Sequence, residues 1–203
     1  MRLDAVRTLL AQQDRVVARR QLRDAGITQA HIDTLLRRRE LVVVHPGVYL
    51  THTGTPTWSQ RSWAAILYAG RSALHVESAL HHPSQGPPPS GPIHVAVDRS
   101  RRVAPRHGIV VHRVRGLDDL VRWNLSPPRV RLEVAAVEAA HLAADELAAI
   151  SALASAAGCV GVRCSPPWST TSRTGRTACS STATPTGCCV RTGCPSPRRS
   201  RWW

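Results

Sequence analysis

Residues 26–50 read Gly-Ile-Thr-Gln-Ala-His-Ile-Asp-Thr-Leu-Leu-Arg-Arg-Arg-Glu-Leu-Val-Val-Val-His-Pro-Gly-Val-Tyr-Leu. In the first half of this stretch, Ile32, Leu35 and Leu36 recur at the spacing of one helix face. The spacing predicts a helix from about residue 29 to residue 38 that buries this face. The helix would end in a run of three Arg residues.

The second half of the stretch predicts a β-hairpin. Leu41–Val44 and Val48–Leu50 are β-rich runs, and His45, Pro46 and Gly47 between them form a turn tripeptide.

Two further helices are expected before residue 26. Apolar spacing predicts one over Leu3–Gln13 and a second over about Ala18–Ala25, with residues 16–17 leading into it. Gly26 suits the position after a helix because Gly tolerates the left-handed conformation. Thr28 is a good N-cap for the third helix.

The order helix, helix, Gly turn, helix, hairpin is that of a winged helix-turn-helix. In that fold the third helix would enter the major groove of DNA, which is wide enough for one helix, and the hairpin wing could touch flanking phosphate. Arg side chains would mainly neutralise phosphate, whereas other side chains on the third helix would meet base edges. The candidate DNA-binding residues are Arg19, Arg20, Thr28, Gln29, Ala30, His31, Thr34, Arg37, Arg38, Arg39 and His45. The base-edge candidates among them are Gln29, Ala30, His31 and Thr34, for which a solvated surface position is the alternative.

The chain after residue 53 predicts an α+β middle domain. The expected elements are a helix opened by a capping box at Thr57–Gln60, a helix over about Ser72–His81, strands over Ile93–Val97 and Gly108–Val114 around the basic turn Arg99–Arg106, and a long helix over about Val130–Ala157. The predicted fold class is therefore α+β, with a winged helix-turn-helix over residues 1–53, the middle domain over residues 54–157 and a disordered tail over residues 158–203.

The tail differs in composition from the rest of the chain. All 13 acidic residues and all ten His residues precede it, whereas all six Cys residues lie in it. Residues 1–158 carry 20 Arg against those 13 acidic residues, which is about half of the net charge of +14. The basic balance suits DNA, although the absence of Lys also fits codon bias in a GC-rich genome.

Motifs of common enzymes and metal sites are missing from the sequence. A P-loop needs Lys, and neither Gly-x-Ser-x-Gly nor His-Glu-x-x-His occurs. His75 with His81 and His82 lacks a Cys or carboxylate partner at ligand spacing, and no Cys-x-x-Cys pair exists. We expect a protein without catalytic, metal or cofactor sites. It also lacks a signal peptide and a bilayer-spanning stretch, so we expect it in the cytoplasm.

Residues 16–50 resemble a large actinobacterial family with an AbiEi-type antitoxin N-terminal domain, which is a winged helix-turn-helix. The most specific piece is the His-Pro-Gly-Val-Tyr turn after the Arg-rich helix end, and the match continues through Glu77-Ser78-Ala79 and Ile93–Val97. It covers about residues 3–157. The resemblance implies a regulator that binds double-stranded DNA, like antitoxins of type IV abortive-infection systems that repress their own operon, and a cognate toxin as partner. Ala18 stands where the family would have a capping Ser or Thr.

Many members of that family look fused to a domain similar to very-short-patch-repair endonucleases. Read one frame over, the gene for the tail can encode strings that restore acidic residues and His, which indicates a frameshift near residue 158. The alternatives to a DNA-binding regulator are a truncated, inactive member of the endonuclease-like family and a protein-interaction module.

Overall fold

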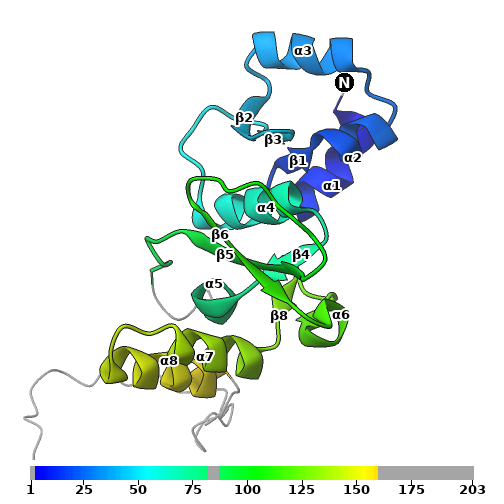
Figure 1. Cartoon of the computed structure of the whole chain (residues 1–203). Coiled ribbons are helices and arrows are strands. Elements are labelled where there is room, and N and C mark those ends of the chain that lie inside the picture. The colour runs from blue at the N-terminus through cyan, green and yellow to red at the C-terminus, as the bar shows by residue number, and fades with distance from the viewer. Residues whose placement is uncertain (1–2, 82–86, 160–203) are drawn as a thin grey trace, which may run out of the picture. The chain divides into compact units, whose positions relative to one another are not determined.

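The computed structural model describes residues 3–81 and 87–159, and they form a mixed α+β structure with two β-sheets and eight α-helices (Figure 1). The predicted α+β class is confirmed. The predicted tail lies outside the described residues except for residues 158–159, which belong to the last helix. No described helix is long and apolar enough to cross a bilayer.

The N-terminal elements follow the predicted order with one addition. They are η1 (Asp4–Val6), α1 (Arg7–Gln12), β1 (Val16–Ala18), α2 (Arg19–Asp24) and α3 (Gln29–Arg37). Gly26 has φ 78°, the left-handed conformation expected for it. The addition is β1: the two Val residues expected to lead into the second helix form a strand instead.

The first sheet has the strand order β1-β3-β2 and is antiparallel throughout. The predicted hairpin is confirmed as β2 (Val42–His45) and β3 (Val48–Leu50), with Gly47 at φ 75° in the turn. β1 forms because Val16 pairs with Leu50 at the far side of the hairpin. A three-residue apolar run has no period of its own, so only this distant pairing determines its structure.

Helix α4 (Trp58–Ala69) begins at the predicted capping box. The Thr57 hydroxyl accepts a hydrogen bond from the Gln60 N–H at 3.2 Å, and the Gln60 side chain accepts one from the Thr57 N–H at 3.0 Å. These two bonds satisfy backbone donors that a helix start leaves free. Gly70 follows the helix at φ 86°. The buried residues of α4 include Trp63, Ile66 and Leu67.

The second sheet is mixed and has the strand order β6-β5-β4-β8-β7. Its strands are β4 (Ser72–Leu74), β5 (Ile93–Asp98), β6 (Ile109–Val114), β7 (Val121–Arg122) and β8 (Arg129–Val130), with the short helices α5 (Val76–Leu80) and α6 (Leu117–Leu120) between them. The prediction of one helix over Ser72–His81 was wrong in its first half, because Ser72–Leu74 pairs with β5. β5 and β6 run parallel, so the basic segment between them crosses from one end of the sheet to the other.

The long helix predicted over Val130–Ala157 is two helices, α7 (Leu132–His141) and α8 (Glu146–Cys159). The Asp145 carboxylate accepts a hydrogen bond from the Ala148 N–H at 2.7 Å, which starts a new helix at this point. The prediction missed the break because the Ala-rich sequence on both sides favours helix. Residue 130 itself belongs to strand β8.

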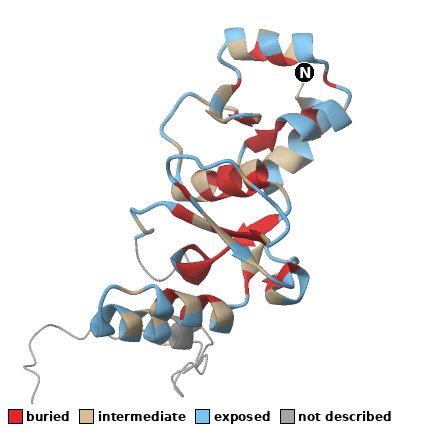
Figure 2. Cartoon of the chain, in the orientation of Figure 1, coloured by how far each residue is buried: buried red, intermediate tan, exposed pale blue. Residues whose placement is uncertain are grey.

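Helix α4 contacts both sheets (Figure 2). Trp63, Ala64 and Leu67 pack against Val16 and Leu50 of the first sheet. A different side of the same helix, with Ala65, Ile66 and Ala69, packs against the second sheet. The N-terminal elements and the second sheet therefore share one helix as a common part of their cores.

Candidate nucleic-acid interface

One side of helix α3 is exposed to solvent, and the opposite side packs in the core and holds the helix in place. Ile32 and Leu35 are buried in a cluster with Leu22 of α2. On the opposite face Ala30 and Arg37 are exposed, and Thr34 is half-buried. This arrangement agrees with the predicted burial and leaves one side of the helix available to a partner.

The Thr28 hydroxyl caps α3 as predicted, since it accepts a hydrogen bond from the His31 N–H at 3.4 Å. Thr28 itself is exposed, and His31 is half-buried beside it. The cap fixes where the first turn of α3 begins and so determines which side chains that turn exposes.

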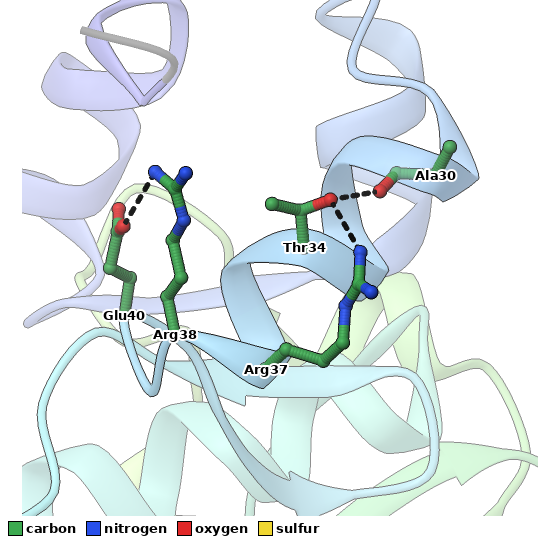
Figure 3. Close-up of polar contacts among 5 residues, drawn as sticks. All are labelled: Ala30, Thr34, Arg37, Arg38 and Glu40. Carbon is green, nitrogen blue, oxygen red and sulfur yellow. Dashed lines mark hydrogen bonds and ion pairs between the residues drawn. The ribbon is translucent and has the colours of Figure 1, made fainter.

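The polar side chains of α3 form hydrogen bonds within the helix (Figure 3). The Thr34 hydroxyl donates to the Ala30 carbonyl at 2.8 Å and accepts from the Arg37 guanidinium at 3.2 Å. The Gln29 amide donates to the Asp33 carboxylate at 2.8 Å. Exposed bonds of this kind contribute little net free energy, so a base or phosphate partner could replace them at small cost.

The C-terminal end of α3 has a residue in an unfavourable conformation. Arg39 has φ 57°, and its N–H donates to the Leu36 carbonyl at 3.1 Å, while the Glu40 N–H donates to the Leu35 carbonyl at 3.0 Å. This pair of bonds is the Schellman arrangement, in which the left-handed residue is usually Gly. An Arg there costs roughly 1–2 kcal/mol in backbone strain.

The three Arg residues at this end keep most of their positive charge unpaired. Arg38 lies 3.9 Å from Glu40, with both side chains exposed, and such a pair contributes little (Figure 3). Arg37 and Arg39 have no carboxylate partner among the ion pairs of the described residues. The end of α3 is therefore a region of positive potential.

The remaining predicted residues lie at the opposite end of the hairpin. The Arg19 N–H donates to the Gly47 carbonyl at 2.7 Å, which ties the start of α2 to the turn between β2 and β3. Arg19 and Arg20 are exposed. The predicted residues thus form two groups, one on α3 and one around this turn, joined by the four residues of β2.

His45 contacts the body of the molecule. It is the last residue of β2, and its ring centroid lies 5.5 Å from that of Tyr68 on α4. Partial burial lowers the pKa of His45 below its usual value, and the nearby positive charge of Arg106 lowers the pKa further. This side chain anchors the turn more directly than it offers a contact to a partner.

The structure adds a basic group that the sequence prediction left without a role. Arg99, Arg101, Arg102 and Arg106 lie in the segment between β5 and β6, and all four are exposed. The signal in the sequence was four Arg residues within residues 99–106 without an acidic residue. Their placement beside the β2–β3 turn depends on the parallel pairing of β5 and β6, which the sequence pattern did not show.

Three His residues meet at the second sheet. His94 Nδ1 and His112 Nε2 are 2.9 Å apart, and the His75 and His112 ring centroids are 5.2 Å apart. Burial is the main cause that lowers the pKa of each, for His75 to about 4. Among the described residues, no group of three His, Cys, Asp or Glu side chains could hold a metal ion.

The chain matches no family model, and no curated protein matches it at a significant level.

Proposed function

We propose that this protein is a DNA-binding regulator of the winged helix-turn-helix class, similar to antitoxins that repress their own operon. The observation that carries the proposal is α3: one side is buried in the core, and the exposed side leads to three Arg residues that keep a net positive charge.

The order of elements supports this class. α2 and α3 are joined through Gly26, and β2 and β3 form the hairpin that would serve as the wing. β1 adds a third strand beside that hairpin. A helix presented from such a scaffold fits the major groove, which is about 12 Å wide.

Some residues of α3 would contact base edges, and the Arg residues at its end would contact phosphate. Gln29 and Thr34 can donate and accept hydrogen bonds at base edges, and the Ala30 methyl group can contact a thymine methyl. Arg37, Arg38 and Arg39 would hold phosphate, which orients the protein without reading the sequence. Binding should then weaken steeply as salt rises, because each phosphate contact releases counterions.

The test compares two matched double variants. Arg37→Gln/Arg39→Gln removes two exposed charges from α3, and Arg122→Gln/Arg131→Gln removes two from β7 and the start of α7, at the far edge of the second sheet from β6. The DNA is a duplex of about 30 base pairs, roughly three helical turns, from upstream of the gene. Fluorescence anisotropy measures the affinity of each protein for this duplex at several salt concentrations.

We expect the α3 pair to weaken binding roughly tenfold or more near 0.1 M salt and the control pair to leave it unchanged. No binding by the unmodified protein at low salt would overturn the proposal. Equal loss in both variants would also count against it, because the effect would then be one of net charge alone.

A further inference from the structure

The segment that connects β5 to β6 is the most basic part of the second sheet. Residues 99–108 contain four Arg residues and no acidic residue, and all four side chains are exposed. We propose that this crossover segment is a second DNA-backbone contact, which holds phosphates of the same duplex that receives α3. The inference rests on the proposed function and extends it to a part of the chain outside the helix-turn-helix.

The backbone of the crossover segment is held near its start and in its middle. The Asp98 carboxylate accepts a hydrogen bond from the Ser100 N–H at 2.9 Å, and the Tyr68 hydroxyl donates to the Ala104 carbonyl at 3.0 Å. Val103 packs against the core between α4 and the sheet. Because the backbone is anchored, the Arg side chains are presented from a fixed support, which lowers the entropy lost when they bind.

The acidic side chains of the described residues do not neutralise this segment. None of the four Arg residues takes part in the ion pairs found there. Arg101 lies over Gly70, where its guanidinium would be 2.7 Å from an added Cβ, and so faces the C-terminal end of α4. A helix C-terminus attracts a cation, so Arg101 has a structural role as well. Arg99, Arg102 and Arg106 have no comparable partner within residues 3–81 and 87–159.

The crossover segment lies beside the β2–β3 turn. The His45 ring contacts Tyr68 at 5.5 Å, Tyr68 binds the crossover through Ala104, and the charge of Arg106 acts on His45. On the other side of the turn, the Arg19 N–H binds Gly47 at 2.7 Å. The turn between β2 and β3 therefore lies between the start of α2 and the crossover segment. Arg19 and Arg20 of α2 and the Arg residues of the crossover segment together form one basic band.

The distance from α3 to this band is close to the width of the DNA major groove, so one duplex could contact both. β2 begins soon after α3 ends and reaches the turn in four residues, or roughly 13 Å at about 3.3 Å per residue. The major groove is about 12 Å wide, so a helix in the groove has the flanking phosphate rows at a similar separation. The crossover would then contact the backbone beside the groove that α3 occupies.

The experiment uses the full chain, the promoter duplex defined above and an unrelated duplex of the same length. Arg102→Gln/Arg106→Gln is compared with the control pair Arg122→Gln/Arg131→Gln and with Arg102→Lys/Arg106→Lys, which keeps the charge. Thermal melting of each variant checks that the fold is retained. For each protein, log affinity is plotted against log salt.

We expect the Gln pair to reduce the slope of log affinity against log salt by about 2, which is one per lost phosphate contact. The affinity for both duplexes should fall by the same factor. The Lys pair should restore most of the slope, and the control pair should leave it unchanged. A Gln pair that binds like the unmodified protein, while Arg37→Gln/Arg39→Gln loses binding, would overturn this inference and leave the proposed function standing. If the unmodified protein binds neither duplex at low salt, both fall.

A hydroxyl-radical footprint on the promoter duplex gives an independent readout. The unmodified protein should protect the deoxyriboses that border the groove occupied by α3 and also those on one side of that groove. The Gln pair should lose only the protection at the side. Protection unchanged in the Gln pair would contradict a backbone contact by the crossover segment.

Discussion

Arg39 shows a conflict between stability and charge at a single residue. Its position at the end of α3 takes the left-handed conformation, with φ 57°, that Gly adopts most easily. Strain of this kind collects at functional sites, where another requirement determines the residue. The proposed phosphate contact supplies such a requirement, because Gly would relieve the strain but remove the charge.

The substitution Arg39→Gly should therefore move stability and DNA binding in opposite directions. Removing the strain should raise the free energy of unfolding by about 1 kcal/mol, and removing the charge should weaken DNA binding several-fold. Urea unfolding measures the first effect and anisotropy the second. Arg38→Gly is the control, since Arg38 has right-handed helical φ and ψ and should lose stability. An Arg39→Gly protein that binds DNA like the unmodified chain would remove Arg39 from the interface.

At the scale of elements, three His residues couple three neighbouring parts of the second sheet. His75 joins β4 to α5, whereas His94 and His112 lie on β5 and β6. His75 is 1% exposed, and its Nδ1 atom has no hydrogen-bond partner. The carboxylates of Glu77 and Glu138 act on His94 and His112 in the direction that raises the pKa, but burial outweighs them. Burial therefore favours the neutral form of the three imidazoles.

The fold should lose stability as pH falls through the range between 6.5 and about 4, because the folded pKa of His75 is lowered to about 4 from 6.5. In this range the unfolded chain binds a proton that the folded chain does not, so protons favour unfolding. Between pH 7 and pH 5, His75 should remove about 2 kcal/mol from the free energy of unfolding.

Urea unfolding at several pH values measures this loss. His75→Gln should flatten the dependence, and the exposed His107→Gln should keep it. A His75→Gln profile as steep as that of the unmodified protein would show that other groups cause the loss.

The elements that sequence predicted best are those with signals at their own ends. α4 has a capping box and a terminal Gly, and α3 has its Thr cap and apolar stripe, so local rules determined both. β1 and β4 have three residues each and form through pairing with β3 and β5, which are distant in sequence. Local patterns contain no information about such pairing. Residues 16–17 were therefore predicted as an entry to the second helix, and Ser72–Leu74 as part of a helix.

The candidate site was predictable to the same extent. The α3 residues were identified because they share one helix, whose period places them on one side. The crossover Arg residues were seen as a basic turn but not as neighbours of the β2–β3 turn. Their position follows from the parallel pairing of β5 with β6 and from the Tyr68–Ala104 bond, which join segments far apart in the chain.

At the scale of the whole described structure, α4 is the part that the two sheets share. Trp63, 9% exposed, packs in the cluster with Val16 and Leu50 of the first sheet, and Ile66 on another side of α4 packs with the second. Each sheet therefore buries apolar surface against the same helix. If α4 unfolds, both sheets lose their cover, so we expect them to unfold together.

Trp63→Ala should accordingly destabilise both sheets by the same amount. Loss of a buried Trp costs about 3–5 kcal/mol, and a shared helix would transmit that cost to the second sheet as well. Amide hydrogen exchange measures the opening free energy at Tyr49 in β3 and at Val95 in β5. Trp123→Ala is the matched control: its ring is 39% exposed and rests on Arg71, so we expect a loss of only about 0.5–1 kcal/mol. A Trp63→Ala protein in which Tyr49 loses protection while Val95 keeps it would show that the two sheets unfold independently despite their common helix.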